Sequence, residues 1–397
     1  MESNARREVL VVSGVRTAIG TFGGSLKDIG PTTLGATVVR EALRRASIDG
    51  SEVGHVVFGN VIPTEPKDAY LGRVAALEGG VAEQTPALTV NRLCGSGLQA
   101  IISAAQAILL DDAAIAVAGG AESMTRAPYL ATGARWGARM GDIRLVDTMT
   151  GTLTDPFHGI HMGITAENVA ERHGISREEQ DALALESQRR AARAVEAGYF
   201  KDQIVPITLR SKHAESEFSV DEHVRAVTTA DELSKLKPIF KKEGTVTAGN
   251  SSGLNDGAAA VVLAEAKTAA RQGLQPMARL VSYGHAGVDP RYMGMGAAPA
   301  ARQALQRAGL DVDAIDVIES NEAFAAQACA VAREMRFDPA KMNPNGSGIS
   351  LGHPIGATGA IIVVKALHEL RRIGGRYALV TMCIGGGQGI AAVFERL

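Results

Sequence analysis

The sequence predicts an α/β fold built from two similar halves with an insertion between them. Three observations support this prediction. Short apolar runs of strand length alternate with helical segments near both ends of the chain, the order of the first third returns in the last third, and a charged stretch over residues 122–249 separates the two. Because strands that alternate with helices form sheets covered on both faces, we expect a mostly parallel sheet.

The first half reads as alternating elements around a cysteine. In order, we expect a strand at 9–12, a helix at 34–46, strands at 53–58 and 87–90, a helix at 97–110 and a strand at 114–118. Cys94 lies between the expected strand at 87–90 and the apolar, Ala-rich helix at 97–110. Gly119 and Gly120 are expected to end the strand at 114–118.

The middle stretch, residues 122–249, differs in character. It is rich in Arg, Lys, Asp and Glu, and it holds an amphipathic helix at about 178–197 among long irregular segments. Such a segment is not expected to add strands to a buried sheet. We interpret it as an insertion that carries a binding surface and oligomer contacts.

The last third repeats the opening order. We expect a strand at 278–281, a helix at 299–308, a strand at 316–318, a glycine-rich approach to His353, a buried helix at 356–370 and a strand at 377–380. Cys94 and His353 thus occupy matching places in the two halves, which favours a duplicated α/β domain with one active site at the junction. We divide the chain into an N-terminal domain, 1–272, which includes the insertion at 122–249, and a C-terminal domain, 273–397.

Bulk composition restricts the class of protein. The 397 residues are 46% hydrophobic and 21% charged with a formal net charge of −2, which gives no electrostatic case for nucleic acid or an anionic membrane. No signal peptide or apolar run of membrane-spanning length is evident. Three cysteines at unrelated spacings favour reduced thiols over a disulfide framework or a zinc site. We expect a soluble cytoplasmic protein with no nucleic-acid or membrane partner.

Two of the cysteines lie among glycines, where a backbone can approach a substrate closely. Cys94 precedes Gly-Ser-Gly and a helix, so the helix start should favour its thiolate and offer N–H groups to an oxyanion. Cys383, before Gly385, is placed at the end of the last strand. Each could instead be a packing residue, and Cys329 is expected to be an inert core residue. A nucleophile paired with an acid/base thiol suits carbon–carbon chemistry beside a thioester.

Two further polar residues could complete such a site. His353, between Gly352 and Pro354, could take a proton from Cys94 or donate to a thioester oxygen, although a turn-capping role is the alternative. Asn321 could orient a water or a carbonyl, or be a plain helix N-cap. His161 lies in a glycine-bearing segment. The dinucleotide fingerprint and the phosphate-loop signature are both missing, which argues against a nucleotide enzyme.

The combination of motifs is more specific than any one of them. The set closely resembles the thiolases, acetyl-CoA C-acyltransferases, from about residue 9 to the C-terminus, and looks closest to the bacterial biosynthetic β-ketothiolases. The motifs are 91–98 (Asn-Arg-Leu-Cys-Gly-Ser-Gly-Leu), 119–124 (Gly-Gly-Ala-Glu-Ser-Met), 161–167 (His-Met-Gly-Ile-Thr-Ala-Glu), 247–258 (Thr-Ala-Gly-Asn-Ser-Ser-Gly-Leu-Asn-Asp-Gly-Ala), 321–325 (Asn-Glu-Ala-Phe-Ala), 352–359 (Gly-His-Pro-Ile-Gly-Ala-Thr-Gly) and 383–389 (Cys-Ile-Gly-Gly-Gly-Gln-Gly).

The resemblance implies a fold, an assembly and a ligand. It implies a five-layer αβαβα core of two like α/β halves, an inserted α+β loop domain that binds coenzyme A, and a homotetramer built as a dimer of dimers. Coenzyme A and acyl-CoA are implied as substrates, with no resident cofactor and no metal. Ser347 stands where many relatives have glycine, which concerns the local loop shape rather than the catalytic set.

The resemblance also assigns roles to residues. Cys94 matches the acylated nucleophile and Cys383 the acid/base, while His353 activates the nucleophile and forms an oxyanion site with Asn321 acting through a water. A second oxyanion site would use the backbone N–H groups of Cys94 and Gly385. The substrate contacts it implies are Met162, Met293 and Phe324 in the acyl pocket, Gln188, Arg225, Ala248 and Ser252 toward the pantetheine and adenine ends, and His161 beside Met162.

The implied activity is reversible condensation of acetyl-CoA with an acyl-CoA to give a 3-ketoacyl-CoA and CoA through acyl-Cys94. One alternative is a decarboxylating condensing enzyme of the ketoacyl synthase type. Cys383 argues against it, because decarboxylation makes an acid/base cysteine unnecessary. The other alternative is a non-catalytic CoA- or lipid-binding scaffold, which predicts gaps in the catalytic set.

Overall fold

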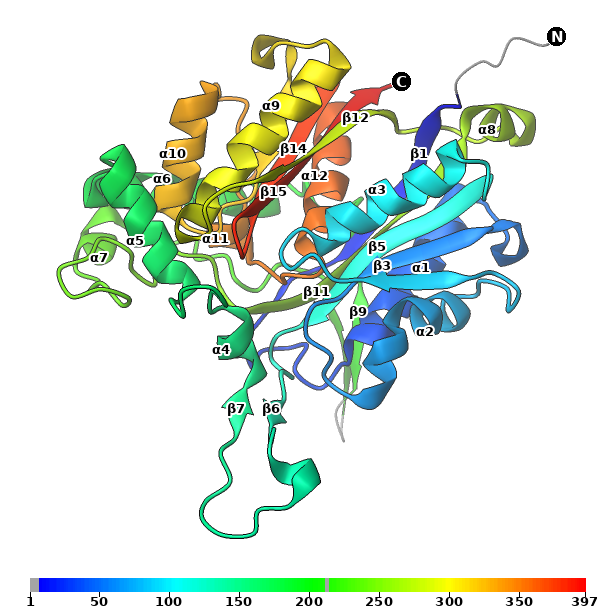
Figure 1. Cartoon of the computed structure of the whole chain (residues 1–397). Coiled ribbons are helices and arrows are strands. Elements are labelled where there is room, and N and C mark those ends of the chain that lie inside the picture. Colours follow the sequence, from blue (N-terminus) through cyan, green and yellow to red (C-terminus); the bar gives the residue numbers. More distant parts are fainter. Residues whose placement is uncertain (1–6, 211–213) are drawn as a thin grey trace.

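The computed structural model describes residues 7–210 and 214–397. The N-terminal half contains β1 (Val9–Thr17), β2 (Gly20–Thr21), α1 (Pro31–Ala46), β3 (His55–Gly59), α2 (Leu71–Glu78), β4 (Ala87–Val90), α3 (Ser96–Leu109), β5 (Ile115–Ser123), β11 (Asn255–Glu265) and α8 (Ala266–Gln272). The C-terminal half contains β12 (Ala278–Gly287), α9 (Ala297–Ala308), β13 (Val317–Ser320), α10 (Ala325–Met335), α11 (Gly348–Leu351), α12 (Thr358–Ile373), β14 (Tyr377–Ile384) and β15 (Gln388–Arg396). Figure 1 shows both halves.

The two halves have the same strand order. The sheet runs β13-β14-β15-β12-β1-β11-β5-β3-β4, so β12-β15-β14-β13 repeats β1-β11-β5-β3. In each half the outer pair is parallel and the inner pairs are antiparallel. β1 and β12 pair over only two residues each, Leu10 with Arg279 and Val11 with Ala278. We therefore call β1-β11-β5-β3-β4 the first sheet and β12-β15-β14-β13 the second sheet, joined at this short contact. The predicted pair of similar α/β halves is confirmed.

The prediction of a mostly parallel sheet is wrong, because two antiparallel strands, β11 and β15, were not recognised. β15 follows β14 through the turn at Gly385–Gly387, and strands joined by so short a turn must run antiparallel. β11 is buried at every position, so its Ala-rich sequence lacks the alternation of a half-exposed strand. Both strands lie inside their sheets and reverse the chain direction there.

Gly119 and Gly120 do not end β5, which continues to Ser123. They serve close packing instead. A Cβ on Gly120 would lie 2.2 Å from the carbonyl oxygen of Gly356, so only glycine lets the second half approach the first at this point. This approach brings the segment after His353 against the end of β5.

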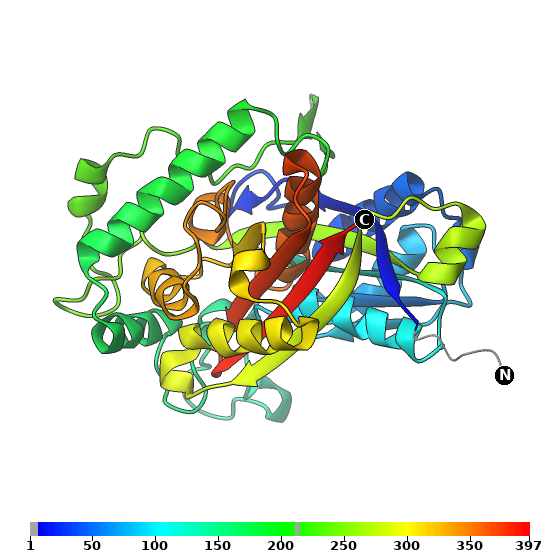
Figure 2. The same ribbon diagram turned by 90° about the horizontal axis from the view of Figure 1, so that it is seen from above.

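Helices and sheets stack in five layers, as the resemblance implied (Figure 2). α1 and α2 cover the outer face of the first sheet, and α9, with α10 packed beside it, covers the outer face of the second. α3 and α12 pack together between the sheets. The start of each central helix therefore lies at the seam between the halves, and Cys94 and His353 come just before these two starts.

The insertion holds α4 (Thr148–Thr152), α5 (Met162–His173), α6 (Arg177–Glu196), α7 (Ala230–Ser234) and the short strands β6 (Tyr129–Leu130), β7 (Val146–Asp147), β8 (Ile204–Val205), β9 (Ile207–Arg210) and β10 (Glu215–Phe218). Contrary to expectation it adds a strand, since β8 pairs with β1. Arg16 fixes this connection from a fully buried position. Its guanidinium donates to both carboxylate oxygens of Asp221 at 2.7 and 2.8 Å and to Gln203 Oε1 at 2.7 Å.

None of the helices in the described ranges combines the length and the apolar character that crossing a membrane requires.

Candidate active site

A cavity of about 390 Å³ at the seam collects most of the predicted site residues. Its wall is largely apolar and draws on both halves and on the insertion. The predicted residues that line it are Cys94, His161, Met162, Ala248, Ser252, Met293, Phe324, His353, Cys383 and Gly385. Asn321 lies directly behind this wall, and Gln188 and Arg225 line a neighbouring cavity.

Cys94 is presented by a strained turn before α3. Leu93 has a φ of 46°, in the left-handed region that non-glycine residues rarely adopt. Ser96 holds the turn, because its Oγ donates to the carbonyl oxygen of Leu93 at 2.7 Å and accepts from the N–H of Arg92 at 2.8 Å. The predicted position just ahead of a helix is confirmed.

The thiol of Cys94 is protonated at neutral pH. Burial raises its pKa to about 11, the backbone N–H groups of Gly385 and of Cys94 itself oppose the rise, and the charge of Glu122 adds to it. The N–H groups near the helix start do lower the pKa, in the expected direction, but desolvation outweighs them. A base must remove this proton before the sulfur can attack.

His353 has an unprotonated ring nitrogen, as the base that accepts this proton must have. Its Nδ1 lies 2.7 Å from Thr358 Oγ1, and that hydroxyl donates its hydrogen to the carbonyl oxygen of Pro354 at 2.9 Å. Thr358 Oγ1 must then accept from Nδ1–H, which leaves Nε2 as the unprotonated nitrogen. Burial lowers the pKa of His353 to about 4, so the imidazole is neutral at pH 7.

Asn321 lies beside that free nitrogen. Its Nδ2 is 3.4 Å from His353 Nε2, and its own N–H donates to the carbonyl oxygen of Thr381 at 3.0 Å, two residues before Cys383. Its Oδ1 is buried and has no partner within the described parts of the chain. The N-cap alternative is excluded, because α10 begins at Ala325 with Phe324 as its cap.

Cys383 lies at the end of β14, which is the penultimate strand and not the last as predicted. The side chain is buried and belongs to the apolar cluster that also contains Met162 and Phe324. Burial raises the pKa of Cys383 far above its usual range, and the charge of Cys94 raises it further. The two thiols are therefore close enough to influence each other's ionisation.

His161 lies in the cavity wall and caps the helix that follows it. Its Nδ1 accepts from the N–H of Gly163 at 3.0 Å and so caps α5, while its ring stacks on Phe240 at 4.8 Å between centroids. Burial lowers its pKa. The neutral ring contributes a flat, partly apolar surface to the cavity.

A second cavity, of about 580 Å³, adjoins the first and shares Ala248, Ser251 and Gly253 with it. Gln188 and Arg225 line this outer cavity. Gln188 Oε1 accepts from the N–H of Arg225 at 2.8 Å, so the glutamine holds the segment that carries the arginine.

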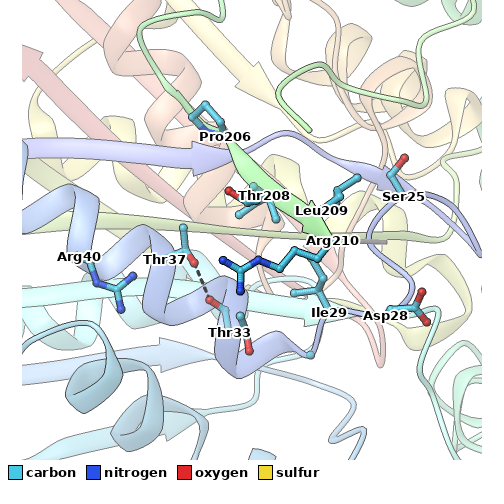
Figure 3. A pocket seen from close by; sticks show the side chains of 12 residues that line it. Ser25, Asp28, Ile29, Thr33, Thr37, Arg40, Pro206, Thr208, Leu209 and Arg210 are labelled. Atoms are coloured by element: carbon cyan, nitrogen blue, oxygen red, sulfur yellow. Dashed lines mark hydrogen bonds between the residues drawn. The ribbon is translucent and has the colours of Figure 1, made fainter. Parts of the chain in front are cut away.

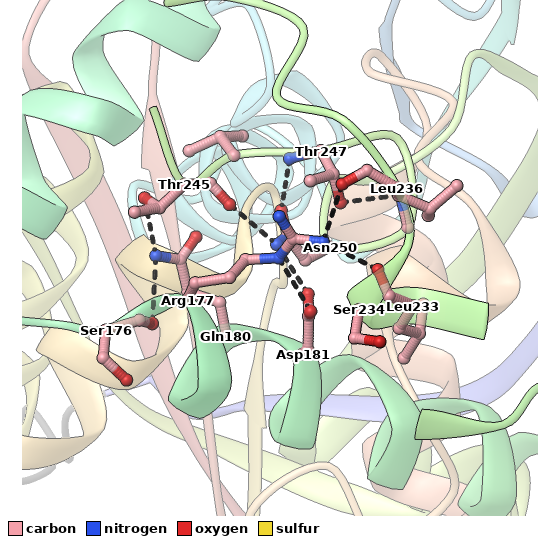
Figure 4. Close-up of polar contacts among 12 residues, drawn as sticks. Ser176, Arg177, Gln180, Asp181, Leu233, Ser234, Leu236, Thr245, Thr247 and Asn250 are labelled. Carbon is pink, nitrogen blue, oxygen red and sulfur yellow. Dashed lines mark hydrogen bonds and ion pairs between the residues drawn. The ribbon is translucent and has the colours of Figure 1, made fainter. Parts of the chain in front are cut away.

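The loop that separates the two cavities is anchored on α6 (Figure 4). Asn250 Oδ1 accepts from the N–H of Thr247 at 2.8 Å, and its Nδ2 donates to Asp181 Oδ1 at 2.9 Å. Arg177 Nε donates to the other oxygen of Asp181 at 2.7 Å. This network was not predicted, although Asn250 lies in the motif at 247–258.

Sequence reasoning also missed the supports of the imidazole. Thr358, which sets its tautomer, lies in the motif at 352–359, so its position in that motif was the available signal. Asn255 Oδ1 accepts from the N–H of His353 at 2.9 Å. Asn255 lies in the motif at 247–258, but its partner could not be predicted because the two residues are 98 positions apart.

A separate groove of about 590 Å³ lies between α1 and β9 (Figure 3). It is lined by polar side chains such as Asp28, Thr33, Thr37 and Arg210, and no thiol or imidazole is among its described lining residues. Thiol chemistry therefore belongs to the seam cavity. Within the described ranges, no three His, Cys, Asp or Glu side chains form a group that could hold a metal ion.

The buried imidazole makes stability depend on pH. Since the pKa of His353 is lowered from 6.5 to about 4, the unfolded chain binds the proton that the folded protein refuses, and stability falls as the pH drops through this window. Between pH 7 and pH 5 the loss from this one group should be about 2 kcal/mol. Urea unfolding of the wild type and of His353→Asn at both pH values measures it. Equal pH dependence of the two proteins would contradict a buried neutral imidazole.

Comparison with known proteins agrees with this geometry. The family model described as "Thiolase, N-terminal domain" matches residues 9–267, and "Thiolase, C-terminal domain" matches 274–396. The chain is 70% identical to the β-ketothiolase BktB of Cupriavidus necator over 392 residues, which cover 98% of this chain and 100% of the relative.

Solved structures agree as well. The acetyl-CoA acetyltransferase of Bacillus anthracis superposes with a TM-score of 0.97 at 48% identity and covers 100% of both chains. The human mitochondrial 3-ketoacyl-CoA thiolase in complex with CoA superposes with a TM-score of 0.96 at 45% identity and covers 98% of each chain. The chain belongs to the thiolase family.

Proposed function

We propose that this protein is a β-ketothiolase that reversibly joins acetyl-CoA and an acyl-CoA into a 3-ketoacyl-CoA and free CoA. The observation that carries the proposal is the placement of two thiols and one neutral imidazole in the wall of a single apolar cavity. Relatives named β-ketothiolase and acetyl-CoA acetyltransferase support it. It is an acyltransferase activity.

In the first half-reaction His353 Nε2 takes the proton of Cys94, and the thiolate attacks the thioester carbon of acetyl-CoA. The backbone N–H groups of Cys94 and Gly385 both lower the pKa of the Cys94 thiol. We assign them as the donors to the oxyanion that forms when the thioester carbon is attacked. As the tetrahedral intermediate collapses, the CoA sulfur leaves and takes a proton from Cys383. The products are acetyl-Cys94, free CoA, an imidazolium and the Cys383 thiolate.

The second half-reaction uses these two charges. The Cys383 thiolate removes a proton from the carbon alpha to the second thioester, and the imidazolium Nε2–H, together with Asn321 through a water, stabilises the enolate oxygen. The enolate attacks acetyl-Cys94, and the released Cys94 sulfur regains its proton from His353.

Substrate binding follows the two cavities. We assign the inner one, with Met162, Met293 and Phe324, to the acyl group, and the outer one to the rest of CoA, with Arg225 supplying positive charge for its phosphates. Ala248 lines both cavities, and Ser252 lines the inner one. CoA is a substrate in this proposal, with no resident cofactor or metal, and the cytoplasm is the compartment.

For the assembly we propose a homotetramer, a dimer of dimers. The hairpin around β6 and β7 extends away from the body of the chain (Figure 1) and exposes apolar side chains, with Trp136 84% and Met140 97% exposed. β4 ends the described sheet and exposes Leu88 on its free edge, a surface suited to pairing with a second copy.

Replacing the apolar tip should dissociate the tetramer into dimers. In Trp136→Ser combined with Met140→Ser the arm loses its apolar contact area, while the free edge of β4 is unchanged. Light scattering measures the mass. A variant that remains tetrameric would contradict the role of the arm, and a monomeric wild type would contradict the assembly.

The two cysteines should separate the half-reactions. Cys94→Ala should form no acyl-enzyme when acetyl-CoA is added, as measured by intact-protein mass. Cys383→Ala should still accept the acetyl group, although more slowly because CoA then leaves without a proton from Cys383. It should lose condensation by about 10²–10⁴-fold, the usual contribution of a general acid/base. Cys329→Ala serves as the control and should keep wild-type thiolysis of acetoacetyl-CoA.

An acetyl adduct on Cys94→Ala would overturn the nucleophile assignment. Release of CO₂ from malonyl-CoA by the wild type would favour a decarboxylating condensing enzyme over a thiolase. Failure of the wild type both to cleave acetoacetyl-CoA in the presence of CoA and to release CO₂ from malonyl-CoA would leave only the scaffold alternative.

A further inference from the structure

Glu122 is a fully buried carboxyl group at the end of β5, where the two halves meet. Four donors point at it. Oε1 accepts from Asn60 Nδ2 and from the N–H of Ile62, both at 3.1 Å, and Oε2 accepts from the N–H of Val61 at 3.0 Å and of Gly356 at 2.8 Å. The fourth donor belongs to the C-terminal half, so one side chain joins segments of both halves.

The contacts are those of an ionised carboxylate. Each oxygen accepts two hydrogen bonds, and all four partners are N–H donors, a pattern in which a carboxyl proton would have no acceptor. Burial raises the pKa of Glu122 to about 8, and the N–H groups of Ile62, Val61 and Gly356 oppose that rise. The geometry favours the charged form, because those donors are fixed parts of the backbone.

Through its hydrogen bonds to residues 60–62, the Glu122 carboxylate supports the turn that presents Cys94. Val61 and Ile62 form a small apolar cluster with Met124 and Ile355, and Cys94 packs against this cluster. Asn91 Nδ2 donates to the carbonyl oxygen of Val61 at 3.3 Å. A shift of this segment would therefore move Cys94.

Through Gly356 the same carboxylate holds the loop that carries the imidazole. The N–H of His353 is bound by Asn255, and three residues later the N–H of Gly356 is bound by Glu122, so the N-terminal half holds the loop at two points. A Cβ on Gly356 would lie 2.4 Å from Glu122 Oε2, which shows how closely the two fit.

We propose that Glu122 is a positioning residue that fixes the distance between the Cys94 thiol and the His353 imidazole. The inference rests on the proposed function, because proton transfer between these two groups starts that reaction. Glutamine at this position keeps the size but replaces one acceptor oxygen by an NH₂ group, so two of the four N–H groups then face a donor. A misplacement of about 1 Å in a reacting group can cost about 10²-fold in rate.

The experiment compares Glu122→Gln with Glu265→Gln in the full-length protein. Glu265 is a second buried glutamate, and it caps α8 at the far end of β11, away from the cavity. Thiolysis of acetoacetyl-CoA gives kcat and KM, rapid mixing with acetyl-CoA gives the rate of acyl-enzyme formation, and thermal melting reports the fold. In Glu122→Gln we expect kcat and the acylation rate to fall by about 10²-fold while KM stays unchanged, because Glu122 does not contact the two cavities. Glu265→Gln should keep both kinetic constants.

Several results would overturn the inference. A folded Glu122→Gln with wild-type kcat would show that the carboxylate positions nothing, and an equal change in kcat and KM would indicate general structural damage. If Glu122→Gln does not fold, Asn60→Ala decides, since it removes a single donor; a smaller loss of kcat at constant KM supports the inference, and wild-type kcat overturns it. An inactive wild type would instead refute the proposed function.

Discussion

Desolvation at the seam between the two halves is the constraint on which the rest of the site depends. An imidazole buried there is neutral, and a thiol buried there is protonated. Neither group is reactive alone. In the proposed reaction, proton transfer from Cys94 to His353 creates the nucleophile, and the hydrogen bond between Nδ1 and Thr358 keeps Nε2 as the accepting atom.

The duplicated fold explains how one site acquires these groups from distant parts of the chain. Each half presents a reactive residue just before its central helix, and α3 and α12 pack against each other between the sheets. Contacts across the seam then fix the geometry, since Asn255 of the first half binds the N–H of His353 and Glu122 binds the N–H of Gly356. The insertion completes the site by covering the cavity and by anchoring its loop on α6.

Much of this could be predicted from the sequence, because local patterns carry local structure. The apolar runs indicated most strands and helices of both halves, and the glycines around Cys94, His353 and Cys383 marked the turns that present them. β11 and β15 were not predicted, because fully buried strands lack the alternation of apolar and polar residues. The antiparallel pairing at the centre of each half was therefore not predicted either. The raised pKa of Cys94 could not be predicted, because it depends on burial by residues far along the chain. The supports Glu122 and Asn255 lie in the motifs at 119–124 and 247–258, but their contacts to Gly356 and His353 span 234 and 98 positions, so local patterns did not indicate these partners. The division between 272 and 273 stays a prediction.

The protonation state of His353 tests the account most directly. Nitrogen-15 NMR of the imidazole at pH 7, assigned by comparison with His353→Asn, reports which ring nitrogen carries the proton. The structure predicts a neutral ring with the proton on Nδ1 and a free Nε2. An imidazolium, or a proton on Nε2 of the resting enzyme, would contradict the claim that this histidine waits as the base for Cys94.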